Sequence, residues 1–489
     1  MLELKTVNLK RAHVDTLVVP VCEDRDIHGD AVLSALSTSA KAMVEFNGKT
    51  GETLTLFHPE GLSVVRALFF GLGKTEKLTA ESLRAFGGRA VKFCINAGLA
   101  DMTVATPSVG AVDIEASTVF RSMMEGCCLG NHLFDRYKQK REKVPLKKVV
   151  FMGTAAQRKA YTGLARTVEA VCAAGIQARE WVSMPSNDKQ PDAFAALIRA
   201  AARSAGLKAR IMDERWLEKQ RFGAMLAVGQ GSGAKPRLVV VEYAPERAKQ
   251  TIVLVGKGVT FDSGGINLKP SGSIETMKMD MSGAAAVAAT MLAMAHIKPE
   301  VRVIGVMPLV ENMPSGEAIR PGDIVRAFAG KTVEIGNTDA EGRLILIDAL
   351  AWAIKQYQPD TAVDLATLTG ACVVALGEKI AGVFSKDQQL ADAIVAAGKT
   401  THERCWQLPL PEDYTELLKN DHADLSNVGP GRWGGAIVAA LFLSEFVGDT
   451  RWAHIDIAGP AWTKKASDYC GAGGTGFGVR LLCEWIQKI

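Results

Sequence analysis

Residues 251–265 read TIVLVGKGVTFDSGG, in which a short β-branched run, Thr251 to Val255, stops at a glycine-rich loop. Further runs of this type lie at 301–306, 361–365 and 454–457. Helical patterns lie between them, at 282–296 and 343–357. Short apolar runs that alternate with helical stretches predict an α/β architecture, in which active residues collect on the loops that leave the strands. We therefore expect a site on the loop after Val255.

The first part of the chain shows the same alternation and is separated from the rest by a long helical pattern. Strand-like runs lie at 64–70 and 149–152, with a helical stretch at 81–97 between them. A helical pattern covers 160–182, and Pro185 would end it. We predict an N-terminal α/β domain at 1–159, a linker helix at 160–185 and a larger C-terminal domain at 186–489.

The composition predicts a soluble globular protein. Of the 489 residues, 48% are hydrophobic and 22% charged, which excludes the disordered and collagen-like classes. The first twenty residues alternate polar and apolar side chains and lack the pattern of a secretory signal. Apolar runs such as 284–295 are shorter than the ~20 residues that a membrane span needs. We expect a cytoplasmic protein that does not enter a membrane.

Cysteine and histidine patterns argue against the usual sulfur and imidazole metal sites. None of the nine cysteines belongs to a C-x-x-C pair, and the eight histidines show no H-E-x-x-H motif. The cysteines are best explained as reduced, mostly buried thiols. Any metal in this protein must therefore be held mainly by other groups.

The net charge of +4 is unevenly distributed along the chain. The positive excess lies before residue 185, and much of it comes from basic residues at 136–148. A solvated surface loop explains this basic segment. A nucleic-acid contact is the alternative, although no interleaved aromatic residues or helix-turn-helix pattern supports it.

Two segments carry the first candidate site residues. The loop after Val255 holds Lys257, Asp262 and Lys269 among glycines that allow close backbone approach. Asp280 stands between methionines, shortly before a helix of small residues. Each feature has a structural alternative, because the loop is equally explained as a plain turn and an aspartate before a helix often only stabilises the helix N-terminus.

A third segment, residues 337–344, reads NTDAEGRL and runs into a helix. On a helix, Asp339 and Glu341 would point about 200° apart, whereas in an extended loop they would share one side and Arg343 could follow them. Two carboxylates held together repel each other, so a cation is their natural partner. Helix capping is the alternative for this segment.

Together the three segments resemble the leucyl aminopeptidase family, the two-metal cytosolic aminopeptidases. Their spacing matches that family, and the resemblance covers essentially everything after residue 185, including 364–371, 381–385, 452–459 and 474–480. Over the first part it is weaker and rests on patches such as 134–138. One departure is Trp433-Gly434-Gly435, where family members usually have x-Ala-Gly.

The resemblance implies a site for two divalent metal ions, Mn²⁺ or Zn²⁺. One ion would be bound by Lys257, Asp262, Asp280 and Glu341, and the other by Asp262, Asp339 and Glu341. The four carboxylates balance the two ions only if Lys257 is neutral, as it must be to offer a lone pair.

The resemblance also implies the remaining roles in the site. Lys269, kept protonated, would stabilise the oxyanion, and Arg343 would hold a bicarbonate ion that acts as general base. The substrate would be contacted by Met277, Asn337, Thr367, Leu368, Gly370, Ala458 and Ala461. The pocket for the first side chain is apolar, so leucine or methionine would be favoured by only a few kcal/mol over smaller residues.

We accordingly expect a homohexameric aminopeptidase that releases N-terminal residues, preferably leucine and other apolar ones, from short peptides. The implied fold has a smaller macro-like N-terminal α/β domain and a larger C-terminal domain whose mixed sheet is flanked by helices. The alternative is a DNA-binding or regulatory hexamer in which peptidase activity is secondary. An inactive scaffold is disfavoured because all seven metal and catalytic positions are filled by matching residues.

Overall fold

The computed structural model describes residues 1–489, which divide into two compact units. Unit 1 comprises Met1–Ala173 and Lys465–Gly471, and unit 2 comprises Ala174–Lys464 and Ala472–Ile489. Both units are α/β, as the sequence predicted. The division falls inside one long helix, α4 (Ala155–Ser183), which begins earlier than residue 160, where we expected it.

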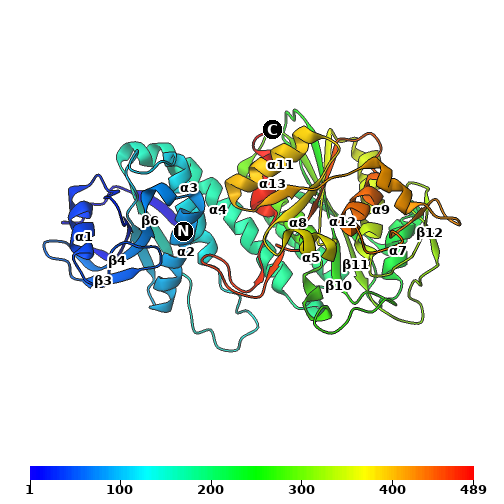
Figure 1. Ribbon diagram of the computed structural model, residues 1–489, viewed down its shortest axis with the longest axis horizontal. Helices are drawn as coiled ribbons and strands as arrows, with labels where there is room; N and C mark the ends of the chain where they lie inside the picture. Colours follow the sequence, from blue (N-terminus) through cyan, green and yellow to red (C-terminus); the bar gives the residue numbers. More distant parts are fainter. The chain divides into compact units, whose positions relative to one another are not determined.

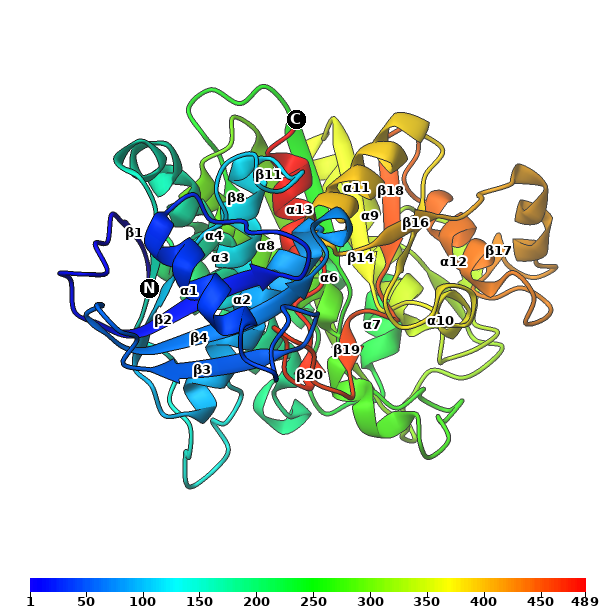
Figure 2. The ribbon, with the colours of Figure 1, turned by 60° about the vertical axis from the view of Figure 1, so that its left-hand side comes forward.

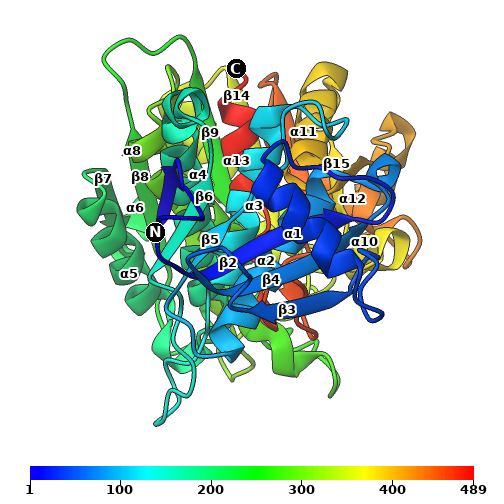
Figure 3. The ribbon, with the colours of Figure 1, turned by 90° about the vertical axis from the view of Figure 1, so that its left-hand side faces the viewer.

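Unit 1 is built on a six-stranded sheet with the order β1-β6-β5-β2-β4-β3. Its strands are β1 (Leu2–Lys5), β2 (Val14–Cys22), β3 (Thr53–Phe57), β4 (Val64–Gly73), β5 (Asp101–Val104) and β6 (Lys148–Met152). Its further helices are α1 (Ala31–Lys41), α2 (Ala80–Asn96) and α3 (Ala116–Gly130), with a 3₁₀ turn, η1 (Thr75–Lys77). All neighbouring strands are parallel except the edge pair β3 and β4, which lie side by side in Figure 3.

Unit 2 contains a nine-stranded mixed sheet with the order β16-β15-β18-β14-β9-β11-β8-β7, with β10 paired to β11. These strands are β7 (Lys208–Met212), β8 (Arg237–Tyr243), β9 (Thr251–Gly256), β10 (Gly258–Asp262), β11 (Arg302–Asn312), β14 (Thr361–Ala366), β15 (Ala381–Phe384), β16 (Cys405–Gln407) and β18 (Trp452–Asp456). The central strands β11, β9, β14 and β18 run parallel, so their carboxyl ends share one edge.

Two small sheets complete unit 2. One consists of β12 (Ile324–Arg326), β13 (Thr332–Glu334) and β17 (Leu425–Ser426), and the other of β19 (Trp462–Thr463) and β20 (Gly473–Gly474). The pair β19 and β20 is antiparallel and can be followed in Figure 2. The three-stranded sheet brings Leu425 and Ser426 next to Val333 and Glu334, because β17 pairs with β13.

The helices of unit 2 cover both faces of the central strands. They are α5 (Pro191–Ser204), α6 (Glu214–Gln220), α7 (Gly223–Gly229), α8 (Ser282–Ile297), α9 (Glu341–Tyr357), α10 (Gly370–Leu376), α11 (Gln388–Thr401), α12 (Gly435–Ser444) and α13 (Val479–Ile486). The 3₁₀ turns are η2 (Ser186–Asp188), η3 (Ile274–Met279) and η4 (Glu412–Leu418). Helices α8 and α9 both pack on β9, β11 and β14, and Figure 1 shows them on opposite sides of these strands.

Burial explains why these segments adopt these elements. All six residues of β14 are buried, as are the last five of β9, which suits apolar strands covered by helices on both faces. Helix α8 is rich in alanine and methionine and is buried almost all round. By length and composition alone, the helical stretch Ile274–Ile297, in which η3 precedes α8, could cross a membrane, but 78% of its apolar window is buried inside the protein.

Candidate metal centre

The candidate residues converge at the edge formed by the carboxyl ends of the central strands. Lys257 lies between β9 and β10, and Asp262 is the last residue of β10. Asp280 follows η3 directly before α8. Glu341 is the first residue of α9, and Asp339 lies in the turn before it. The structure thus places Asp339 and Glu341 neither on one helix nor in an extended loop, but on either side of a helix start.

Glycines let the chain approach itself closely around this edge. Gly264 and Gly265 have φ values of +87° and +66°, so the loop after Asp262 turns back, and Lys269 N donates to Ser263 O at 2.9 Å. A Cβ on Gly342 would lie 2.6 Å from Lys257 Cε, so a larger residue there would displace this lysine side chain.

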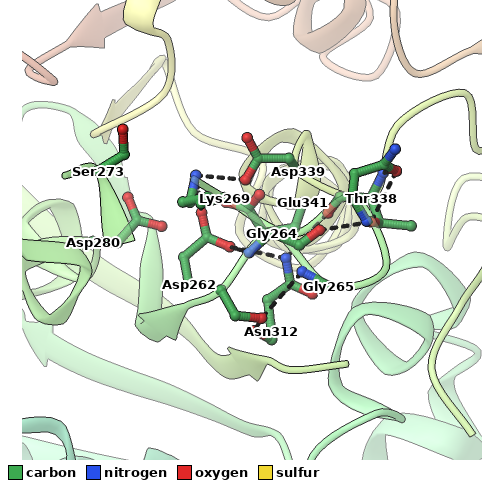
Figure 4. Close-up of polar contacts among 12 residues, drawn as sticks. Asp262, Gly264, Gly265, Lys269, Ser273, Asp280, Asn312, Thr338, Asp339 and Glu341 are labelled. Atoms are coloured by element: carbon green, nitrogen blue, oxygen red, sulfur yellow. Dashed lines mark hydrogen bonds and ion pairs between the residues drawn. The ribbon is translucent and has the colours of Figure 1, made fainter. Parts of the chain in front are cut away.

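Two ammonium groups lie among four carboxylates. Lys257 Nζ is 2.8 Å from Asp280 Oδ2 and 2.8 Å from Glu341 Oε1. Lys269 Nζ is 2.8 Å from Asp262 Oδ2 and 2.5 Å from Asp339 Oδ1. Figure 4 shows Lys269 next to its partners Asp262 and Asp339, with the carboxylates of Asp280 and Glu341 in the same cluster.

Burial distinguishes the two lysines. The Lys257 side chain is 3% exposed, and its Nζ also donates to Thr367 O at 2.7 Å. The Lys269 side chain is 14% exposed and its partner Asp339 is 33% exposed. Lys257 is therefore enclosed, whereas Lys269 lies on the side of the cluster open to solvent.

The charges perturb one another strongly. Burial raises the pKa of Asp280 well above its usual value, and burial also raises the pKa of Asp262, with the Glu341 charge acting in the same direction. Burial alone would lower the pKa of Lys257, but the carboxylates of Asp280, Glu341 and Asp262 together raise it. Lys269 behaves in the same way, with Asp262 the strongest of the carboxylates that raise its pKa.

The donor set fits a divalent cation. Ligand oxygens of Asp262, Asp280 and Glu341 lie within 4.8 Å of one another, and all three residues are buried. Glu341 Oε2 is buried and accepts no hydrogen bond. Four carboxylates against two ammonium groups leave an excess negative charge, which is expensive in a buried site unless a cation offsets it. Carboxylate oxygens suit hard or borderline ions such as Mn²⁺ and Zn²⁺.

Arg343 lies on α9, two residues after Glu341, and is 7% exposed. Its Nη1 donates to Asn427 O at 2.6 Å, while its Nε is buried and has no hydrogen-bond partner. Burial lowers the pKa of Arg343 to about 10, opposed by the nearby charges of Glu341 and Asp456, so the guanidinium is charged at neutral pH. Arg343 therefore places a buried positive charge two residues from Glu341.

The predicted substrate-contact residues lie on four segments: η3, the turn before α9, and the segments after β14 and β18. Thr367 is the best connected, since its Oγ1 donates to Asp280 Oδ1 at 2.7 Å. Asn337 Oδ1 accepts from Asp339 N at 2.8 Å. The others follow strands or lie in η3: Met277 in η3, Leu368 and Gly370 after β14, and Ala458 and Ala461 after β18. Of these, Met277 and Leu368 are half-buried, Gly370 is exposed and Ala461 is buried.

Three buried residues that sequence reasoning missed hold the site in place. Asn312, at the end of β11, donates through Nδ2 to Asp262 Oδ1 at 2.9 Å. The Asn427 side chain bonds the backbone of 336–337 in both directions. Asp456 binds the loop after β14. The position of Asn312 at a strand end was a usable signal, as was that of Asp456 within the matched segment 452–459, whereas nothing local marks Asn427.

The chain matches two domains described for one family. Residues 176–483 match the catalytic domain of the cytosol aminopeptidase family, and residues 18–141 match its N-terminal domain. The chain belongs to the cytosol aminopeptidase family. This confirms the family that the sequence motifs indicated and identifies the protein as a metallo-exopeptidase, a hydrolase that acts as an aminopeptidase.

Relatives of the cytosol aminopeptidase family match along nearly the whole chain. A probable cytosol aminopeptidase from Geobacter sp. (strain M21) is 43% identical over 462 residues, covering 94% of this chain and 93% of the relative. The solved structure of the bottromycin maturation enzyme BotP in complex with Mn has a TM-score of 0.87 at 34% identity, covering 97% of this chain and 99% of that one. A mutant of tomato leucine aminopeptidase has a TM-score of 0.87 at 33% identity, covering 100% and 96%.

Proposed function

We propose that this aminopeptidase binds two divalent metal ions at the cluster and removes leucine and other apolar residues from the N-termini of short peptides. The observation that carries the proposal is the buried group of Asp262, Asp280 and Glu341, with an unpartnered oxygen on Glu341. In this proposal one ion is held by this group together with Lys257. The other is held by Asp262, Asp339 and Glu341.

The two lysines take different roles because they differ in exposure. Lys257 is enclosed by Asp280 and Glu341, so it suits a ligand that gives up its proton when a metal binds. Lys269 lies on the open side of the cluster, and its carboxylate neighbours favour the ammonium form. A protonated amine in that position suits the stabilisation of an oxyanion that develops on the peptide carbonyl.

When bound, two such ions polarise the scissile carbonyl and make a water nucleophilic at neutral pH. The chain supplies the positioning and the proton handling. Asp280, held by Thr367 Oγ1, suits the substrate's free amine, which explains the requirement for an N-terminal residue. In this proposal the charged guanidinium of Arg343 holds a bicarbonate ion that takes a proton from the attacking water.

The pocket for the first side chain would be formed by residues that follow β14 and β18 and by Met277. The small or apolar side chains there, Ala458 and Ala461 among them, leave space for an apolar group. Each methylene that such a pocket accommodates favours the larger residue by roughly 1–3 kcal/mol. We therefore expect leucine and methionine to be preferred over alanine.

The test is hydrolysis of a leucine anilide by protein that is stripped with chelator and resupplied with Mn²⁺ or Zn²⁺. Asp339→Ala is the test variant, and Asp449→Ala, which removes an exposed aspartate of the same unit, is the matched control. We expect metal to restore activity to the wild type and the control only. Folded wild-type protein that stays inactive with every metal would contradict the proposal.

The inferred assembly is a homohexamer, which mass measurement in solution tests directly. A DNA-binding hexamer remains the second candidate, because most basic side chains of 136–148 are exposed. Neutralising them should then abolish a salt-sensitive shift of duplex DNA. Unchanged DNA mobility of the wild type at low salt would leave the segment as a solvated loop.

A further inference from the structure

Asp456, the last residue of β18, binds two loops at once. It is 0% exposed. Its Oδ1 accepts from Leu368 N at 3.2 Å and from Ala458 N at 3.1 Å, and its Oδ2 accepts from Thr369 Oγ1 at 2.7 Å. One buried carboxylate thus ties the loop after β14 to the loop after β18.

The strand register explains why one side chain reaches both loops. β14 and β18 are parallel neighbours, and Ala366 at the end of β14 is paired with Asp456 at the end of β18. The two loops therefore leave the sheet side by side. They carry five of the residues proposed to contact substrate: Thr367, Leu368, Gly370, Ala458 and Ala461.

Thr369 links Asp456 to the next helix. Its Oγ1 accepts from Cys372 N at 3.0 Å, where it caps the start of α10. Its hydroxyl proton is donated to Asp456 Oδ2, because a carboxylate oxygen can only accept. Asp456 consequently holds both the loop and, through Thr369, the first turn of α10, which begins with Gly370.

The same loop is attached to the charged cluster one residue earlier. Thr367 Oγ1 donates to Asp280 Oδ1 at 2.7 Å, and Thr367 O accepts from Lys257 Nζ at 2.7 Å. The loop after β14 is therefore held in two ways. Thr367 is bonded to the charged cluster, and Leu368 and Thr369 are bonded to Asp456 of β18. Releasing the Asp456 end would let the pocket wall move while Thr367 stays anchored.

We propose that Asp456 is a positioning residue that sets the selectivity of the aminopeptidase for the first side chain of its substrate. It does so by holding the loops after β14 and β18 at a constant separation. The inference rests on the proposed function, since it concerns the pocket assigned there. Asp456 itself need not touch the substrate.

The test compares Asp456→Ala with the wild type on leucine and alanine anilides at equal metal content. We expect the KM for the leucine substrate to rise about tenfold, kcat to change less than about threefold, and the leucine-to-alanine ratio of kcat/KM to fall about tenfold. Amide hydrogen exchange should accelerate in 366–371 and 457–461. Asp456→Asn should restore most of the ratio, because its Oδ1 still accepts both N–H groups and its Nδ2 faces Thr369 Oγ1.

Asp348→Ala is the matched control, because Asp348 is also 0% exposed and accepts two backbone N–H groups, from Met225 and Phe328. A purely structural role for Asp456 predicts that both variants lose stability alike and keep the wild-type KM and selectivity, and that result would overturn the proposal. Should Asp456→Ala fail to fold, Thr369→Ala, with Thr369→Ser as its rescue, carries the same test.

The outcomes also separate this inference from the proposed function. Wild-type protein without hydrolysis of either anilide would overturn both. Active wild type whose selectivity survives Asp456→Ala refutes only the role of Asp456. Unchanged hydrogen exchange in both loops would refute it as well, independently of any activity.

Discussion

Asp280→Asn should have opposite effects on the metal-free and the metal-loaded protein. In the metal-free cluster, Asp280 is attracted by Lys257 at 2.8 Å, which at an effective dielectric of about 20 is worth about 6 kcal/mol. It is repelled by Asp262 and Glu341, whose ligand oxygens lie within 4.8 Å, at about 3.5 kcal/mol or more each. Attraction and repulsion nearly cancel, which leaves the cost of burying the charge unopposed.

Removing the charge should therefore leave the chelated protein at least as stable as the wild type, by up to about 1–2 kcal/mol. The amide can turn so that its oxygen faces Lys257 and its nitrogen donates to Thr367 Oγ1, which in turn still donates to the Asp280 main-chain oxygen at 3.2 Å. With about 300 residues in unit 2, the unfolding entropy is about 0.6 kcal/mol/K, so the melting temperature should stay level or rise by up to about 3 °C.

Metal binding should reverse this order. An ion at about a hundred times its Kd adds about 2.7 kcal/mol, or about 4 °C per ion, so two ions raise the wild-type melting temperature by about 8 °C. The variant lacks the Asp280 ligand of one of the two sites, so metal should raise its melting temperature by only about half as much.

Scanning calorimetry in chelator and in Mn²⁺, with metal content measured in parallel, checks the predicted melting temperatures of the variant and the wild type in both conditions. Asp449→Ala serves as the control, which should behave like the wild type in both conditions. A loss of about 5 °C or more by chelated Asp280→Asn, or equal metal-induced shifts in variant and wild type, would refute the reasoning.

Three further predictions concern buried polar residues of unit 2. Asn427→Ala removes the side-chain bonds to the backbone of 336–337, so it should lower metal occupancy by about one ion per subunit through the Asp339 site, measured by elemental analysis. Arg343→Met should lower kcat at least about a hundredfold with little change in KM or metal content, measured by steady-state kinetics with and without bicarbonate. Burial raises the pKa of Asp348 from 3.8 to about 7, so its contribution to stability is fully present below pH 3.8 and is lost as the pH rises through 7. Relative to Asp348→Asn, the free energy of unfolding of the chelated wild type should therefore fall by about 4 kcal/mol between pH 4 and 8, measured by urea unfolding.

Each of these has a clear opposite outcome. Two ions per subunit in Asn427→Ala would show that Asp339 keeps its position without the hydrogen bonds of the Asn427 side chain. An Arg343→Met variant with wild-type kcat would remove the arginine from the reaction. Parallel pH profiles for the wild type and Asp348→Asn would mean that this carboxyl titrates normally in the folded protein.

Hydrophobic periodicity, together with the positions of glycine and proline, predicted most elements of the fold. The run at 361–365 is β14, and the helical stretch at 343–357 is α9, which starts at Glu341. The errors lie at ends: β11 continues to Asn312, beyond the run predicted at 301–306, and α4 begins at Ala155. A local pattern reports which residues are buried, whereas an element's end depends on contacts with distant segments.

The α/β class and the candidate charged residues at 257–280 and 337–343 were available from the sequence by itself, because they follow from local pattern, whereas the family came from the resemblance of these segments to known motifs. Only the tertiary structure decided which partners meet: that Lys257 faces Asp280 and Glu341 while Lys269 faces Asp262 and Asp339, and that Asn427 and Asp456 support them. Lys257 and Thr367 are 110 residues apart, and Arg343 and Asn427 are 84 apart. Such contacts depend on the order of the strands in the sheet, which the hydrophobic periodicity of each separate segment does not encode.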